Sequence, residues 1–227
     1  IERAEQLRAE LTAELALLTS EWRNSWQHAE LDDGRADPVF LIGFPRSGTT
    51  LLDTILMGHP NTVVMEEQPP LNIVEQELGG AAALPGLNAE AIANARARYF
   101  EEVEKLQPVG PGQLLIDKSP LFLYRLPLIL RLFPNARIIL ALRHPCDVVL
   151  SCWMSNFRLN SAMANFLRLE DAAAFYDLCF RHWQTARQLF PVQVHEIVYE
   201  QLVEDVESEV RPLLDWLGLA WDADVLD

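Results

Sequence analysis

The sequence lacks a surplus of positive charge. It has 18 lysine and arginine residues against 33 aspartate and glutamate residues, which gives a formal net charge of −15. Such a surface repels nucleic acids and anionic membranes, so we expect neither as a partner. Any anion that the protein binds has to meet a local positive pocket within a negative field. The other proportions, 50% hydrophobic and 22% charged residues, are those of an ordinary globular protein.

Cysteine is also scarce. The three cysteines, Cys146, Cys152 and Cys179, form no C-x-x-C pair and show no metal-site spacing. An odd number without such a pair suits a reducing compartment, where free cysteines are buried apolar side chains. We therefore expect a cytoplasmic protein that uses no metal.

Long hydrophobic runs are missing as well. None reaches the length of about 18 residues that a membrane span requires. The chain opens on Ile1 rather than Met, so a preceding anchor or domain is left open. Residues 1–31 carry leucines and tryptophans at three- and four-residue steps, which predicts an amphipathic helix and suits the end of a preceding helical domain. Residues 31–38, "LDDGRADP", are typical of a linker, and we expect the main domain at 38–227.

Short apolar runs alternate with helical patterns after Pro38. The runs cover residues 39–43, 62–65, 114–117, 136–142 and 194–199. Helices are expected at about 48–58, 89–106, 120–132, 146–157 and 165–189, and a mobile loop at 79–88. Continuous apolar runs indicate strands that are covered on both faces, and strand-helix alternation indicates a parallel sheet. The sequence predicts an α/β fold of the P-loop type, in which helices flank a central parallel sheet of about five strands, plus an N-terminal helix.

The first loop, residues 43–50 with the sequence "GFPRSGTT", lies between an apolar run and a helical pattern. It is close to the phosphate-binding motif G-x-x-x-x-G-K-[ST], but Thr49 stands at the lysine position. Glycines at both ends let backbone N–H groups and the positive end of the helix converge on an anion. Arg46, Ser47 and Thr50 add side-chain donors. The loop therefore predicts a phosphate or sulfate site, and the alternative is a tight turn that binds nothing.

The missing lysine affects the choice of reaction. A kinase or nucleotide hydrolase uses that lysine, together with magnesium, to neutralise a transferring phosphoryl group. Thr49 cannot supply this charge, and Arg46 is the one cation in the loop. Arginine suits bidentate contact with a tetrahedral oxyanion. A sulfuryl group carries less negative charge, so fixed cations and N–H donors can stabilise its transfer.

The second motif, residues 131–153, reads "RLFPNARIILALRHPCDVVLSCW". It predicts a strand with Arg143 at its carboxyl end and a helix in which Ser151 lies about two turns from the start. Both side chains can face the crevice outside the strand ends, where open α/β sheets bind ligands. Taken singly, Arg143 could instead pair with Asp147 at the surface, and Ser151 could be a solvated or packing hydroxyl.

Together, "PRSGTT", the "HP" that ends the next helical pattern and "LRHP" with "DVVLS" resemble the sulfotransferases that use 3′-phosphoadenosine 5′-phosphosulfate (PAPS). The resemblance runs from Pro38 to the end of the chain. It is strongest toward the tyrosylprotein sulfotransferases and bacterial sulfotransferases fused to helical repeats, through "HPNTVVMEEQP", "DKSP" and "YEQLVEDVESEVRPLLDWLGLAWD". It implies PAPS as co-substrate, 3′,5′-adenosine bisphosphate (PAP) as product, no metal, and a bacterial source.

The resemblance also implies roles for residues. It places the 5′ end of the donor at five residues of the first loop: Arg46, Ser47, Gly48, Thr49 and Thr50. It places the 3′-phosphate at Arg143 and Ser151, and the nucleotide near Tyr199. Arg46 and Lys118 would stabilise the transition state, although an ion pair of Lys118 with Asp117 or a nearby acid is the alternative.

The catalytic base is expected in "MEEQP", at the end of the second apolar run. The resemblance assigns it to Glu67, with Glu66 as the alternative, since successive residues of a strand point in opposite directions. The resulting function is in-line transfer of a sulfuryl group to an acceptor hydroxyl. A P-loop kinase or hydrolase and a non-catalytic nucleotide-binding module are the alternatives. The acceptor is left open between a small molecule, a lipid, a glycan and a protein tyrosine, and a homodimer is compatible with the sequence.

Overall fold

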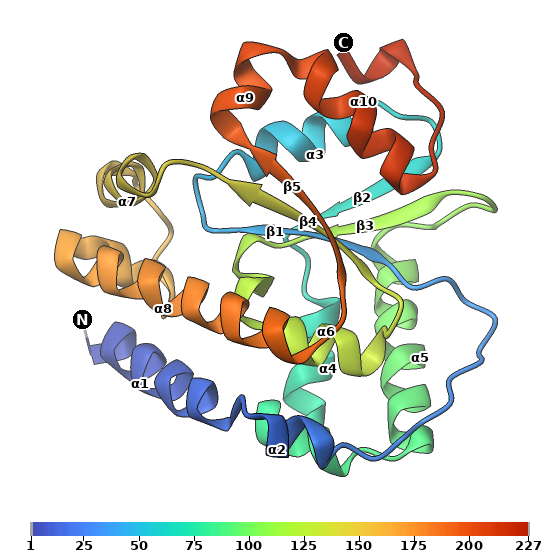
Figure 1. Ribbon diagram of the computed structural model, residues 1–227, viewed down its shortest axis with the longest axis vertical. Coiled ribbons are helices and arrows are strands. Elements are labelled where there is room, and N and C mark those ends of the chain that lie inside the picture. Colours follow the sequence, from blue (N-terminus) through green and yellow to red (C-terminus); the bar gives the residue numbers. More distant parts are fainter. Residues whose placement is uncertain (1, 227) are drawn as a thin grey trace.

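A five-stranded parallel sheet forms the middle of the computed structural model, which describes residues 2–226 (Figure 1). The strands are β1 (Val39–Gly43), β2 (Thr62–Glu66), β3 (Leu114–Lys118), β4 (Arg137–Leu142) and β5 (Gln193–Val198). Their spatial order is β2-β3-β1-β4-β5, and every neighbouring pair is parallel. The predicted fold class is confirmed, and each strand lies within one or two residues of its apolar run.

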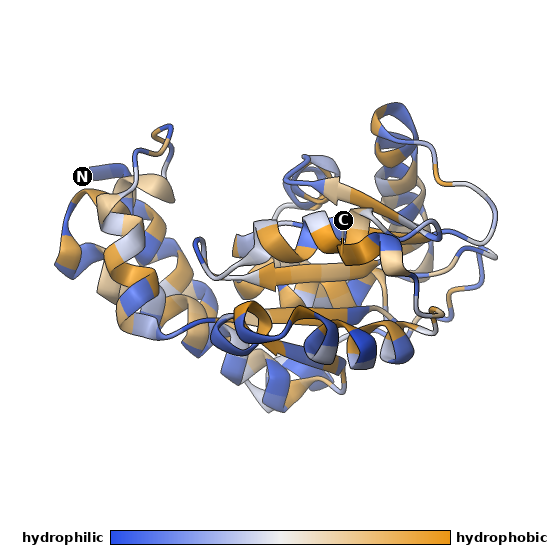
Figure 2. Cartoon of the chain, turned by 90° about the horizontal axis from the view of Figure 1, so that it is seen from above, coloured by the Kyte–Doolittle hydropathy of each residue, from blue (hydrophilic) through white to orange (hydrophobic). Residues whose placement is uncertain are grey.

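The inner strands are apolar on both sides because helices cover both faces of the sheet, whereas the edge strand β5 is more polar and partly exposed. All five residues of β1 are buried. Val39 and Leu41 belong to one hydrophobic cluster, whereas Phe40 and Ile42 belong to the other. Figure 2 shows the middle of the sheet as largely hydrophobic. This two-sided burial is the reason why the sequence shows unbroken apolar runs instead of alternation.

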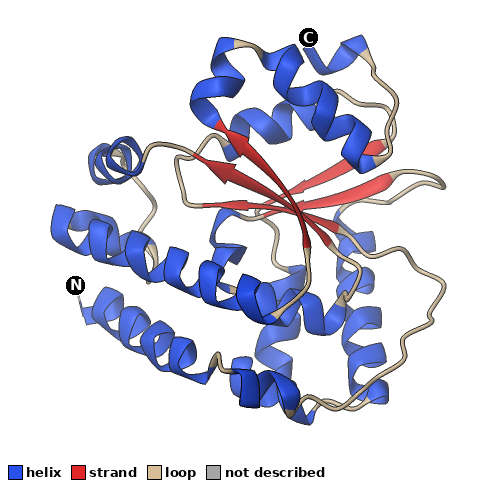
Figure 3. Ribbon diagram, viewed as in Figure 1, coloured by secondary structure: helices blue, strands red, loops and turns tan. Residues whose placement is uncertain are grey.

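The helices form the two outer layers (Figure 3). One face of the sheet is covered by α3 (Thr49–Met57), α9 (Tyr199–Glu204) and α10 (Val206–Leu217). The other is covered by α1 (Glu2–Leu17), α4 (Pro70–Leu78), α5 (Ala89–Leu106), α6 (Leu126–Leu132) and α8 (Leu169–Leu189). The remaining α-helices are α2 (Ser20–Asn24) and α7 (Pro145–Met154), and 3-10 turns lie at 81–86, 120–124, 163–167 and 223–226. None of the helices between residues 2 and 226 is long and apolar enough to cross a membrane.

Several helical segments differ from the sequence predictions. Helices α4, α9 and α10 were not predicted, and the loop expected at 79–88 contains a 3-10 turn. Helix α4 starts on Pro70 and ends at Gly79, whose φ of +88° is left-handed. Helix α10 is capped by the Asp205 side chain, which accepts from Ser208 N at 3.1 Å, and ends at Gly218. These helices are set by their caps as much as by an apolar stripe.

The N-terminal segment packs against the domain. It is two helices rather than one, because Thr19 caps α2 by accepting from Trp22 N at 3.1 Å. Leu11 of α1 is buried in the larger hydrophobic cluster, and its carbonyl accepts a 2.6 Å hydrogen bond from His182 Nε2 on α8. Arg8 pairs with Asp171 at 3.1 Å. The amphipathic stripe of this segment therefore serves the core of the same chain.

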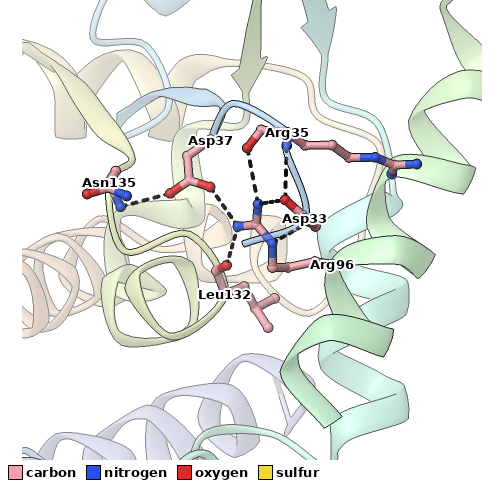
Figure 4. Close-up of polar contacts among 6 residues, drawn as sticks. All are labelled: Asp33, Arg35, Asp37, Arg96, Leu132 and Asn135. Carbon is pink, nitrogen blue, oxygen red and sulfur yellow. Dashed lines mark hydrogen bonds and ion pairs between the residues drawn. The ribbon is translucent and has the colours of Figure 1, made fainter. Parts of the chain in front are cut away.

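The linker before β1 is fixed by one buried arginine, Arg96 of α5 (Figure 4). Its guanidinium, 3% exposed, donates to Asp33 at 2.9 Å, to Asp37 at 2.6 Å and to the Leu132 carbonyl at 2.7 Å. Asp37 also accepts from Asn135 N at 2.8 Å. The hydrogen bond from Arg96 lowers the pKa of Asp33. Because this network joins the linker, α5 and the start of β4, it sets where β1 enters the sheet.

Candidate active site

A candidate residue or segment lies at the carboxyl end of each strand. The first loop follows β1, Glu67 follows β2, and Lys118 is the last residue of β3. Arg143 follows β4 and Tyr199 follows β5. In a parallel sheet these ends share one edge, where ligands bind. The structure thus brings all five segments to the edge of the sheet that the sequence predicts.

The first loop turns sharply at Gly48 to start α3. Gly48 has φ +91°, and a Cβ placed on it would lie 2.5 Å from Cδ2 of Tyr199. Both the left-handed backbone and the close ring require glycine here. The first intrahelical bond of α3 runs from Leu52 N to the Gly48 carbonyl. The N–H groups of Thr49 and Thr50 therefore have no partner within the helix and face outward from its positive end.

Arg46 connects the two motifs. Its Nε donates to Ser151 Oγ of α7 at 3.1 Å, across 105 positions of sequence. The resemblance places Arg46 at the 5′ end of the donor, but in this structure its guanidinium lies beside a residue of the second motif. Arg46 has φ +72°, and among residues 2–226 only Arg46 and Glu67 are non-glycine residues with positive φ. Strained backbone of this kind gathers at functional sites.

Arg143 packs against the first loop from the opposite side. It donates to the Arg46 carbonyl at 3.1 Å, and its guanidinium carbon lies 4.6 Å from the centre of the Tyr199 ring. Its Nε is buried and has no partner in the described part of the chain. The alternative, a surface pair with Asp147, is not among the ion pairs of the described residues. Arg143 is therefore held in place by the Arg46 carbonyl and the Tyr199 ring.

Two predicted donor residues are placed differently from the others. Ser47 is buried, and both its N–H and its hydroxyl donate to the Phe44 carbonyl, so it shapes the turn of the loop. Tyr199 is the first residue of α9 rather than the end of a strand. Its ring lies between Gly48 and Arg143, as the two contacts above require.

Lys118 is fully buried among three carboxylates. Its Nζ lies 3.0 Å from Asp53 Oδ2 of α3, 3.2 Å from Glu66 Oε1 and 3.0 Å from Glu67 Oε1. Burial disfavours the charged lysine, but the carboxylates outweigh it and raise the pKa of Lys118. Asp117 points to the other face of β3, where its Oδ2 accepts from Tyr99 Oη at 2.8 Å. The partners of Lys118 are thus nearby acids and not Asp117.

Glu66 and Glu67 do not point apart, so the expectation of opposite directions is wrong. Glu66 is the cross-strand neighbour of Lys118 in the parallel register, which puts their side chains on one face. Glu67 has φ +48°, and its N–H donates to the Lys118 carbonyl at 2.7 Å. The left-handed backbone at Glu67 ends the regular strand geometry, so the Glu67 carboxylate turns back toward the Lys118 ammonium.

A cavity of about 710 Å³ opens at this edge of the sheet. The predicted residues that line it are Arg46, Gly48, Thr49, Thr50, Glu67, Arg143 and Tyr199. Glu66 borders a different hollow, between β2 and the end of α5. Four arginines and one carboxylate line the cavity, so it is a positive pocket in an acidic protein. Because the net charge of the protein is −15, an anion can bind only at a local positive pocket of this kind.

One wall of the cavity consists of residues that are not among the sequence predictions. This wall consists of Asn72, Ser119, Pro120, Leu121, Phe122, Tyr124, Arg125, Phe157, Arg158, Asn160 and Met163. Arg125 pairs with Glu75 at 2.6 Å, and the pKa of Arg125 is raised because Tyr124 and Glu75 outweigh its burial. About half of these residues could have been predicted, because "SPLFLYR" directly follows Lys118 at the end of its strand. No sequence signal marks residues 157–163.

Residues 38–223 match the sequence model of the sulfotransferase family. The chain belongs to this family. Among its relatives, an uncharacterized protein of Aquifex aeolicus is 32% identical over 210 residues, which cover 84% of this chain and 26% of the relative. Protein-tyrosine sulfotransferase A of Caenorhabditis elegans is 28% identical over 218 residues, which cover 86% of this chain and 54% of the relative. This sulfotransferase-family chain thus spans between about a quarter and a half of these relatives.

Solved structures of sulfotransferases share the fold. The sulfotransferase domain of the Synechococcus PCC 7002 olefin synthase is 25% identical, with a TM-score of 0.52, and the match covers 88% of this chain and 80% of that domain. The sulfotransferase domain of the curacin biosynthetic pathway has a TM-score of 0.59 at 21% identity, with coverages of 85% and 77%. At that identity the curacin domain supports the fold alone.

Proposed function

We propose that this chain transfers a sulfuryl group from PAPS to an acceptor hydroxyl. One observation carries the proposal. The Arg46 and Arg143 side chains join the first loop to the second motif, and this cationic surface opens to the same cavity as Glu67. Membership of the sulfotransferase family, and the sulfotransferase activity for which the relative of Caenorhabditis elegans is named, support this reaction class.

The donor would bind across the joined motifs. The outward N–H groups and hydroxyls of Thr49 and Thr50 suit the 5′-phosphosulfate. Arg143 and Ser151 suit the 3′-phosphate, since the one carries a positive charge at the cavity wall and the other a hydroxyl donor. Arg46 can serve both ends, because it belongs to the first loop and contacts Ser151. Gly48 keeps the Tyr199 ring close to the loop, where it limits the position of the nucleotide.

The reaction would be an in-line displacement. The acceptor oxygen forms a bond to sulfur while its proton passes to the Glu67 carboxylate. The bond between sulfur and the bridging oxygen breaks, and its electron pair remains on the 5′-phosphate of PAP. The Lys118 ammonium, 3.0 Å from Glu67 Oε1, stabilises the charge that develops on the departing oxygen. Glu67 is preferred over Glu66 as base because Glu67 lines the cavity and Glu66 does not.

The lining of the cavity favours an acceptor that tolerates apolar contact. Leu121, Phe122 and Phe157 form its apolar part, and Arg125 and Arg158 its charged part. Small molecules, lipids, glycans and protein tyrosine are the acceptor classes to compare. A panel with a simple phenol, an aliphatic alcohol, a sugar and a tyrosine peptide covers these classes.

The test uses transfer of radioactive sulfur from labelled PAPS to this panel. E67Q should lower turnover by about 100-fold or more, because the proton acceptor is lost, while PAP affinity stays nearly the same. E66Q is the matched control, since it removes the other carboxylate from the same ammonium and should change turnover little. Equal turnover of E67Q and wild type would remove Glu67 from the mechanism. No transfer by the wild type to any acceptor would refute the proposed function.

A further inference from the structure

We infer that Asp53 is a positioning residue, which keeps the Lys118 ammonium charged and in place after Glu67 has taken the acceptor proton. The inference rests on the proposed function. Neither the loop motifs nor the apolar patterns of the sequence single out Asp53. It lies on α3, four residues after Thr49, and therefore on the same side of the helix as the start of the first turn.

The three carboxylates around Lys118 differ in burial. The side chains of Glu66 and Glu67 are 49% and 60% exposed, whereas that of Asp53 is 2% exposed. Because they are exposed, both glutamate carboxylates can leave Lys118 and contact water or a bound molecule instead. Asp53 cannot, because α3 and the sheet enclose it. Asp53 is thus the permanent counter-ion of the ammonium, and the glutamates are exchangeable ones.

The reaction weakens the hold of the other two counter-ions, because Glu67 loses its charge and Glu66 is half exposed. Glu67 becomes neutral when it accepts the proton, and Lys118 has to turn toward the departing oxygen. A fully buried ammonium that loses its carboxylates is strongly disfavoured. Asp53, 3.0 Å from Nζ, preserves one negative charge beside it throughout. The dependence is mutual: burial raises the pKa of Asp53, and the contact with Lys118 acts in the opposite direction.

Asp53 also joins Lys118 to the donor loop. The helix that carries Asp53 is the one whose first N–H groups are proposed to hold the 5′-phosphosulfate, and Lys118 lies on β3 beside β1. The ion pair thereby sets the distance between the lysine and the start of α3. Misplacing a catalytic group by about 1 Å is enough to lower a rate by about 100-fold.

D53N tests this role because it keeps the shape of the side chain and removes the charge. We expect turnover to fall between about 10- and 100-fold, with PAP affinity within about twofold of wild type. E66Q is again the matched control, since it also takes one carboxylate from Lys118 but at an exposed position, and should remain close to wild type. Turnover is expressed per PAP-binding site, so that a partly unfolded sample does not imitate the effect.

A double-mutant cycle with K118M decides whether Asp53 acts through the lysine. In the K118M background D53N should cause no further loss of turnover, and it should raise stability toward urea, since K118M alone leaves a buried carboxylate unpaired. Losses that multiply in the double variant, or full turnover of D53N, would overturn the role of Asp53. A wild type without sulfuryl transfer would instead refute the proposed function, and this inference with it.

Discussion

Replacing Asp117 with asparagine should make the stability of the protein less dependent on pH. Asp117 is fully buried on the face of β3 opposite to Lys118. Its Oδ2 accepts the hydrogen bond from Tyr99, and its Oδ1 has no partner within residues 2–226. Burial raises the pKa of this carboxyl from its ordinary 3.8 to about 7, although the bond from Tyr99 acts in the opposite direction.

The size of the stability change follows from the difference between the folded and unfolded pKa of Asp117. The folded state holds the Asp117 proton more tightly than the unfolded chain, so its contribution to stability is fully present below pH 3.8 and is lost as the pH rises to about 7. One pKa unit corresponds to about 1.4 kcal/mol, so ionisation costs about 4 kcal/mol of folding free energy at pH 8. Asparagine accepts the same hydrogen bond without charge, but its unpaired amide N–H costs about 1–3 kcal/mol. D117N should therefore gain about 1–3 kcal/mol at pH 8 and lose stability at pH 4.

Urea unfolding of both proteins at a series of pH values between 4 and 8 measures this change. The quantity to follow is the difference in unfolding free energy between D117N and wild type, which should change sign over this range. Y99F is the companion variant. It removes the hydrogen bond that favours the ionised carboxyl, so it should destabilise more at pH 8 than at pH 4. A difference between D117N and wild type that does not vary with pH would refute the buried, proton-binding state of Asp117.

Two further substitutions test the loop and the linker. G48A should weaken PAP binding by about 10-fold or more, because alanine is strained at φ +91° and its Cβ would meet the Tyr199 ring; calorimetry that gives wild-type affinity would contradict this packing. R96M should lower the unfolding free energy by about 3–5 kcal/mol, because Asp37 would stay buried without its partner. Its PAP affinity per folded molecule should not change, and urea unfolding with PAP titration separates the two effects.

The sheet was predictable because its inner strands are buried on both faces. A run such as "VFLIG" is apolar at every position for that reason, although the buried helix α6 opens on a similar run, "LPLIL". Helices α4 and α10 each bury an apolar face, but both are short, and their limits depend on Pro70, Gly79, Asp205 and Gly218. Such capping signals are local and weak when read one at a time.

The site was predictable where motifs carry it and unpredictable where tertiary contacts do. Sequence spacing identified Arg46 and Ser151, but not that they touch across 105 positions. The rule that successive strand residues point apart failed at Glu67, because a left-handed glutamate is rare and only the assembled edge of the sheet holds it there. Asp53 gave no signal, since its role depends on a lysine that lies on another strand.

The measurement that tests donor recognition most directly is calorimetric titration of the protein with PAP and with AMP, which differ by the 3′-phosphate. We expect PAP to bind at least about 100-fold more tightly than AMP, since charged hydrogen bonds to Arg143 and Ser151 distinguish the two. In R143M this ratio should fall toward one while AMP affinity stays nearly constant. Equal affinities for PAP and AMP in the wild type, or tighter binding of ATP with magnesium than of PAP, would contradict a site built for the PAPS nucleotide.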